Sequence, residues 1–215
     1  MINIERFVFN PFRVNCYVLY EHSGDCIIVD PSFYDKEEQE IITQFIDSKS
    51  LKPLMIINTH GHVDHVPGIQ FLKDRYSIKS GIHKDDLLLL NNAVEQGLLF
   101  GFRIHKPPPP DFFIEHNQIL SIADSKLEIR HTPGHSPGSV ILYSMKDNFV
   151  ITGDVLFEGS IGRTDLPGGN YHTLLNSIRM EILSLPDETV VYPGHGPSTT
   201  IGDERRKNPF LSELN

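Results

Sequence analysis

The sequence feature that most constrains the fold is the stretch Thr-His-Gly-His-Val-Asp-His at residues 59–65, which directly follows a short apolar run. An apolar run flanked by proline and glycine is typical of a buried strand, so these histidines lie in the loop at its C-terminal end. In extended backbone His60 and His62 point the same way, whereas Asp64 and His65 can face a second point nearby. Imidazoles and carboxylates are ligands for Zn, Fe or Mn. This density of ligand-type side chains favours a metal site over a solvated loop.

The composition is typical of a globular protein. The chain has 215 residues, 39% of them hydrophobic and 22% charged, and we expect one domain spanning residues 1–215. It has no apolar run of membrane-spanning length and no N-terminal signal pattern, so we expect a cytoplasmic protein without a membrane partner. Cys16 and Cys26 fall on apolar runs, and reduced core thiols are favoured over a disulfide. The sequence leaves the oligomeric state open.

The charge balance argues against a nucleic-acid partner. The formal net charge is −9, and the longest basic run is Arg-Arg-Lys at residues 205–207. Nucleic-acid phosphates would need a basic surface, so we expect a small-molecule substrate. Two bound divalent cations would offset part of the negative charge.

The apolar patterning predicts strands first and a strand-helix alternation afterwards. The expected strands cover residues 2–9, 16–20, 26–31, 54–57, 119–122, 127–132, 140–145, 149–152 and 189–192. The expected helices cover residues 35–49, 66–76 and 171–183, the last with Asn170 as its N-cap. This order is compatible with two sheets packed face to face with helices outside.

The regular periodicity breaks at about residues 84–117, and we expect an insertion there. A helix is expected over residues 84–92, but residues 106–110 read Lys-Pro-Pro-Pro-Pro, which favours a polyproline stretch. A long irregular segment in a compact domain is often a lid or binding loop, and we expect that role here. His105, Lys106 and His116 lie in it, and solvated loop roles are favoured for them over substrate contact.

Three later strands end in further ligand-type residues. His135 follows residues 127–132, Asp154 follows residues 149–152, and His195 follows residues 189–192, each beside glycine or proline. Glycine lets the backbone adopt positive φ or approach a ligand closely. Because the pattern repeats at four strand ends, we expect these side chains to converge.

These residues, in this order and spacing, resemble the metallo-β-lactamase superfamily, and the resemblance covers nearly the whole chain. It implies an α/β fold, the αββα sandwich, in which two mixed β-sheets pack face to face with helices outside. It also implies a site for two divalent metal ions at the edge between the sheets, zinc in first place and iron or manganese as alternatives.

The resemblance implies a role for each ligand-type residue. The first metal would be held by His60, His62 and His135, the second by Asp64, His65 and His195, and Asp154 would bridge the two.

The chemistry of two metals agrees with these roles. Cations about 3.5–4 Å apart can share a water or hydroxide, lower its pKa and polarise the group that it attacks, so no side-chain nucleophile is needed. Asp64 is a possible proton acceptor as well as a ligand. Asp30, Thr59 and Thr132 are candidates to orient ligand histidines, with purely structural roles equally open.

Within the superfamily, residues 152–157, 162–165 and 193–204 look like the glyoxalase II-like group, the hydroxyacylglutathione hydrolases and their short relatives. That implies hydrolysis of a thioester such as S-lactoylglutathione. Arg163 is a candidate contact for an anionic substrate, and an ion pair with Asp165 is equally open. Full-length glyoxalase II continues into a glutathione-binding helical domain, whereas this chain ends about twenty residues after His195.

Other functions stay open at this point. Residues 162–165 also resemble persulfide dioxygenases, in which His60, His135 and Asp154 would hold a single iron. Lactone hydrolysis and a binding module without turnover are further alternatives, the last disfavoured because all seven ligand positions are present. β-Lactamases with a cysteine ligand and flavodiiron proteins, which replace the second motif histidine by glutamate, are disfavoured.

Overall fold

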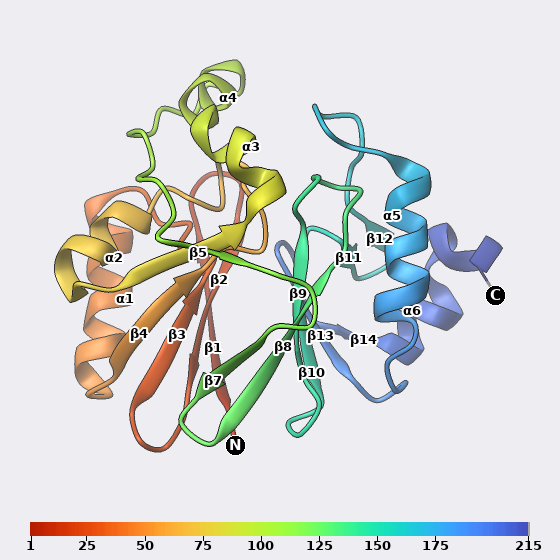
Figure 1. Cartoon of the computed structure of the whole chain (residues 1–215), viewed down its shortest axis with the longest axis horizontal. Helices are drawn as coiled ribbons and strands as arrows, with labels where there is room; N and C mark the ends of the chain where they lie inside the picture. Colours follow the sequence, from red (N-terminus) through yellow and green to blue (C-terminus); the bar gives the residue numbers. More distant parts are fainter. Residues whose placement is uncertain (215) are drawn as a thin grey trace.

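Two six-stranded mixed sheets pack face to face at the centre of the protein, and helices cover their outer faces (Figure 1). This computed structural model describes residues 1–214, with the side chains of residues 1–212. The expected αββα sandwich is therefore confirmed. Among the described residues, no helix is both long and apolar enough to cross a membrane.

The first sheet is formed by the N-terminal half of the chain. Its strands, in spatial order, are β1 (Asn3–Phe9), β2 (Val14–Tyr20), β3 (Asp25–Val29), β4 (Lys52–Ile57), β5 (Lys79–His83) and β6 (Phe112–Ile114). The pairings β1–β2 and β2–β3 are antiparallel, and those from β3 to β6 are parallel. Parallel neighbours need crossover connections, which the helices between them supply.

The second sheet is formed by the C-terminal half. Its strands, in spatial order, are β14 (Thr199–Thr200), β13 (Val190–Pro193), β10 (Phe149–Gly153), β9 (Val140–Ser144), β8 (Ser125–His131) and β7 (Ile119–Ile122). A separate hairpin consists of β11 (Leu156–Phe157) and β12 (Ser160–Ile161). Only the β10–β13 pairing is parallel.

The helices fall into three groups (Figure 1). Those flanking the first sheet are α1 (Lys36–Ser48) and α2 (Ile69–Tyr76), and those flanking the second are α5 (Tyr171–Ser177) and α6 (Ile201–Lys207). The short helices α3 (Leu87–Asn91) and α4 (Ala93–Leu99) stand above the first sheet, at the end where the sandwich opens. Three further turns of helix are η1 (Lys84–Asp86), η2 (Ile178–Ile182) and η3 (Pro209–Leu214).

Alternating side chains of the central strands build three apolar layers. Ile27 packs between the sheets, whereas its neighbour Ile28 packs in the cluster under α1 and α2. In β10, Ile151 packs between the sheets and Val150 in the cluster under α5 and α6. Because both faces of such strands are buried, they read in the sequence as continuous apolar runs.

The structure corrects several expected boundaries. The helix expected over residues 66–76 begins only at Ile69, and the helix expected over residues 171–183 ends as an α-helix at Ser177 and continues as the π-helical turn η2. The single helix expected over residues 84–92 is a 3₁₀ turn followed by α3. Cys16 and Cys26 are buried free thiols, as expected.

Candidate metal centre

Strand direction explains why distant residues meet. Strands β8 and β10 are each antiparallel to β9, and β13 is parallel to β10, so β8, β10 and β13 run the same way. Their C-terminal ends therefore meet at one edge and deliver His135, Asp154 and His195 there. Backbone hydrogen bonds join this edge to the first sheet: Val140 N–H donates to the Thr59 carbonyl at 2.9 Å.

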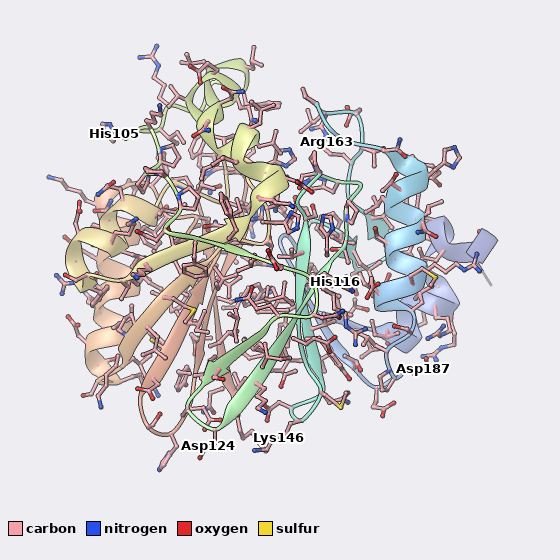
Figure 2. The ribbon with its side chains drawn as sticks, in the orientation of Figure 1. His105, His116, Asp124, Lys146, Arg163 and Asp187 are labelled. Atoms are coloured by element: carbon pink, nitrogen blue, oxygen red, sulfur yellow. The ribbon has the colours of Figure 1, made fainter. Side chains whose placement is uncertain are left out.

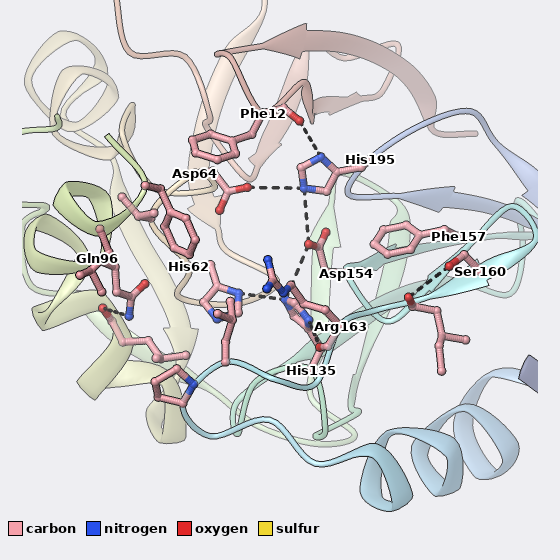
Figure 3. A pocket seen from close by; sticks show the side chains of 17 residues that line it. Phe12, His62, Asp64, Gln96, His135, Asp154, Phe157, Ser160, Arg163 and His195 are labelled. Carbon is pink, nitrogen blue, oxygen red and sulfur yellow. Dashed lines mark hydrogen bonds and ion pairs between the residues drawn. The ribbon is translucent and has the colours of Figure 1, made fainter. Parts of the chain in front are cut away.

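The structure brings the predicted ligand residues into two adjacent clusters. Within each, the ligand atoms lie within 4.8 Å of one another; one cluster is His60, His62 and His135, and the other is Asp64, His65 and His195. Asp154 lies between them: its carboxylate is 3.6 Å from His135 Nε2, 3.5 Å from His65 Nε2 and 3.4 Å from His195 Nε2. Figure 3 shows Asp154 between His135 and His195, with Asp64 across from His195.

Hydrogen bonds fix which ring nitrogen faces the centre. His135 Nδ1 lies 2.8 Å from the Arg163 carbonyl and His195 Nδ1 lies 3.0 Å from the Phe12 carbonyl. A carbonyl only accepts, so each Nδ1 carries the proton and donates it. Nε2 is therefore the ring nitrogen that faces the centre in both residues, and it can give a lone pair to a metal there once it carries no proton.

His60 follows the same logic through a short relay. The Thr59 hydroxyl donates its single proton to Asp30 Oδ2 at 2.7 Å, so it must accept at 3.1 Å from His60 Nδ1–H. His60 Nε2 is then bare. Asp30 Oδ2 also accepts from His65 Nδ1 at 3.1 Å. The expected roles of Asp30 and Thr59 as partners of ligand histidines are thus visible in the geometry.

Buried atoms without partners show that the cluster fits cations. His60 Nε2, His62 Nε2, His65 Nε2 and Asp154 Oδ1 are buried without a hydrogen-bond partner. A buried polar atom without a hydrogen-bond partner lowers the stability of the folded state. Nitrogen lone pairs and carboxylates repel one another at this distance, and a cation between them would remove both costs. The donor set of imidazoles and carboxylates suits divalent metals such as zinc or iron.

The pKa shifts of these groups also favour the binding of a cation. Burial, then the neighbouring His135, lowers the pKa of His62 to about 3, which keeps its imidazole neutral. Burial alone would lower the pKa of His195, but the carboxylates of Asp154 and Asp64 raise it to about 11. Burial would raise the pKa of Asp154, yet His65 and His195 hold it well below the ordinary value. The seven residues therefore attract a cation.

Glycine makes the close approach of these loops possible. A Cβ on Gly194 would lie 2.1 Å from Asp154 Oδ1, and one on Gly162 would lie 1.9 Å from the Asp154 carbonyl oxygen. The loop that carries His195 can therefore reach Asp154 only because residue 194 has no side chain.

One supporting residue was not found by sequence analysis. Asp86, fully buried, accepts the N–H groups of Gly61 at 2.8 Å and Gly138 at 2.5 Å and the hydroxyl of Ser136 at 2.7 Å. It thereby ties the His60–His65 loop to the loop that carries His135. Nothing in the local sequence marks it, because its partners lie 25 to 52 residues away.

A cavity of about 480 Å³ opens onto the clusters, and His62, Asp64, His135, Asp154 and His195 are among its lining residues. Its volume is in the range of small-molecule sites, about 300–1,000 Å³. Figure 3 shows Gln96 and Phe157 on opposite sides of the metal-ligand residues. Both halves of the sandwich thus contribute to the cavity.

A model of one family matches residues 9–195, and its description is the metallo-beta-lactamase superfamily. The chain belongs to this superfamily. Among curated relatives, the probable metallo-hydrolase YqgX of Bacillus subtilis is 41% identical, over 94% of this chain and 94% of its own length. The hydroxyacylglutathione hydrolase GloC of Haemophilus influenzae is 37% identical, over 98% of this chain and 99% of its own.

Solved structures of the superfamily give the same fold. The B3 metallo-beta-lactamase BLEG-1 superposes with a TM-score of 0.90 and 38% identity, covering 98% of this chain and all of its own. TTHA1623, solved in a di-iron-bound form, superposes with a TM-score of 0.87 and 37% identity, covering 96% of this chain and all of its own. Membership and the His/Asp clusters together imply divalent metal ions.

The remaining candidate residues of this superfamily member have other partners. Arg163 lines the cavity and also pairs with Asp165, through contacts of 2.7 and 2.8 Å. The Thr132 hydroxyl donates to the Ser139 carbonyl at 3.3 Å, which favours the structural role that was left open for it over the orienting role.

Within residues 84–117, Leu89, Gln96, Leu99 and Phe100 line the cavity, whereas His105 and His116 do not. His105 lines a different surface pocket, and His116 Nδ1 accepts the His131 N–H at 3.1 Å. Both lie apart from Arg163 (Figure 2). Lys106 and residues 205–207 are likewise not among the described residues that line the cavity.

Proposed function

We propose that this protein is a two-metal hydrolase that cleaves thioesters. The observation that carries the proposal is the convergence of seven ligand side chains, several with buried atoms that lack a hydrogen-bond partner, beside a small-molecule cavity that five of them line. The similarity to GloC, a hydroxyacylglutathione hydrolase, supports the thioester as the bond that is cleaved.

The two clusters would each hold one metal, with Asp154 in contact with both. The metals supply positive charge that acidifies water and polarises the thioester carbonyl. We propose zinc as the native metal, because imidazole and carboxylate sets of this kind suit it; iron is the alternative that the di-iron form of TTHA1623 supports.

The residues of the chain supply orientation and proton transfer. The Nδ1 partners of His60, His135 and His195 hold the rings so that their lone pairs face the centre. Burial would raise the pKa of Asp64, but His65 and His195 lower it, so its side chain is a carboxylate. Asp64 lines the cavity and is placed to accept the proton that water loses and to return it to the departing sulfur.

The cavity offers no side-chain nucleophile that competes with water. Among its described lining residues Ser160 carries the only hydroxyl, which donates to the Ile161 carbonyl at 3.4 Å, and no cysteine lines it. An activated serine would need a base within hydrogen-bond reach.

The complete second cluster favours this function over a mono-iron persulfide dioxygenase. A single iron held by His60, His135 and Asp154 would leave Asp64, His65 and His195 without a task, although their ligand atoms lie within 4.8 Å of one another.

The test is elemental analysis of protein purified without added metal, run beside assays of thioester, lactone, β-lactam and phosphodiester hydrolysis and of oxygen uptake on glutathione persulfide. We expect two metals per chain and release of thiol from thioesters. One iron with persulfide-dependent oxygen uptake, or hydrolysis of a lactone, β-lactam or phosphodiester with none of thioesters, would overturn the proposal.

A further inference from the structure

The walls of the cavity above the metal centre are apolar on both sides. On one side lie Phe12, from the β1–β2 turn, and Leu99 and Phe100, at the end of α4. On the other side lie Phe157 and Ile161, from the β11–β12 hairpin, and Leu166 is a further apolar residue of the lining. A substrate group that fits between these walls would bury its surface against hydrocarbon.

The rim of this cavity exposes large apolar side chains at the C-terminal end of α4. Leu99 is 84% exposed and Phe100 is 46% exposed, although both line the cavity. The rim is held in place, because Phe12 packs edge-on against Phe100, with ring centroids 6.3 Å apart, and against Phe102 at 5.2 Å. A fixed apolar rim next to a reactive centre is suited to bind an apolar ligand.

The charged side chains of the cavity lining also favour an apolar ligand. Arg163 is the only lysine or arginine among the described residues that line the cavity, and both of its contacts with Asp165 are close, at 2.7 and 2.8 Å. A glutathionyl group carries two carboxylates, which would need cationic partners near the centre.

We propose that the substrate is a thioester with an apolar acyl or thiol group, which lies against Leu99, Phe100 and Phe157. This inference rests on the proposed thioester hydrolysis and names its substrate class. Water adds to the carbonyl carbon, the C–S bond breaks, and a carboxylic acid and a thiol leave, so no oxidant or reductant is required. The apolar group stays in contact with the walls throughout.

The experiment measures kcat/KM of the metal-loaded enzyme on two thioester series. The first joins acetyl, butyryl, octanoyl and benzoyl groups to N-acetylcysteamine; the second joins acetyl to N-acetylcysteamine, benzyl mercaptan and octanethiol. S-Lactoylglutathione and S-acetylglutathione are the polar comparisons. We expect kcat/KM to rise at least about tenfold with apolar size in one series, which identifies the side of the thioester that contacts the walls.

The variants Leu99→Ser and Phe100→Ser should remove most of that gain, so that kcat/KM of the larger apolar thioesters falls toward that of acetyl-N-acetylcysteamine. Leu98→Ser is the matched control, because Leu98 belongs to the same helix, is 59% exposed and does not line the cavity. Metal content and circular dichroism of each variant establish that the centre and fold are intact.

Two failures are distinguishable. If the glutathione thioesters are hydrolysed faster than every apolar thioester, or if Leu99→Ser and Phe100→Ser both behave like Leu98→Ser, the apolar substrate class is overturned while thioester hydrolysis stands. If no thioester in either series is hydrolysed, the proposed function itself is overturned.

Discussion

Asp30 Oδ2 lies 3.1 Å from His65 Nδ1, which places a fully buried carboxylate directly behind a histidine of the second cluster. Asp30 follows β3 with a φ of 49°, a backbone conformation that asparagine also tolerates. Asp30→Asn should therefore keep the loop in place while removing the negative charge that holds the His65 proton. We expect metal affinity to fall about 10–100-fold, measured by chelator competition.

The control for Asp30 is Asp35→Asn. Asp35 caps α1 by accepting the Glu38 N–H at 2.9 Å and belongs to neither ligand cluster, and asparagine caps equally well. Wild-type metal affinity in Asp30→Asn would contradict the role of this carboxylate.

Replacing a residue of the ligand clusters should reduce metal binding more than replacing a residue that only orients a ligand. His60→Ala removes one of the bare nitrogens of the first cluster, and we expect metal content to fall from two per chain to one or none. Turnover should fall more than about 100-fold, which exceeds the loss expected when a residue that only orients a ligand histidine is replaced. Elemental analysis and kcat measure both, with the exposed His22→Ala as control. Full activity in His60→Ala would remove the site assignment.

We expect the Asp86 carboxylate to stabilise the fold through its three hydrogen bonds. Asp86→Ala leaves the N–H groups of Gly61 and Gly138 and the Ser136 hydroxyl without their acceptor. At about 1–3 kcal/mol for each unsatisfied buried group, we expect unfolding free energy to fall by at least about 3 kcal/mol. Urea unfolding of the metal-free protein measures this loss. Asp85→Ala, next to it and exposed, is the control; a loss below about 1 kcal/mol in Asp86→Ala would contradict the prediction.

The contrast between Asp86 and His60 shows what the sequence could predict. His60 stands in a run of ligand-type residues after an apolar strand, so periodicity and composition locate it. The same local signals located β4, β8 and β10 and the strand ends that carry His135 and Asp154. The order of these elements was compatible with two packed sheets, and the αββα sandwich itself was implied by the resemblance to the metallo-β-lactamase superfamily.

What was missed depends on partners far away in the chain. Strand β5 contains Gly81, whose missing Cβ leaves room for the Phe112 ring of β6, and neither short strand has a strong pattern of its own. The Arg163 carbonyl orients His135, but a backbone oxygen leaves no trace in the sequence. Such contacts are set only when the two halves of the sandwich meet.

Stability should also depend on a histidine pair away from the centre. The rings of His83 and His131 stack with centroids 4.0 Å apart and planes 15° apart. Burial, and then the neighbouring His131, lowers the pKa of His83 below its ordinary value of 6.5. The folded protein therefore binds fewer protons at His83 than the unfolded chain does, so unfolding free energy rises with pH in this range.

The contribution of His83 is fully present above pH 6.5 and is lost as the pH falls from 6.5 through the lowered pKa of the folded state. His83→Gln cannot take up this proton, so its unfolding free energy should fall less steeply than that of the wild type between about pH 7 and pH 5. Urea titrations of both metal-free proteins across this range measure the two slopes. Equal slopes for wild type and His83→Gln would show that the stacked pair does not resist protonation.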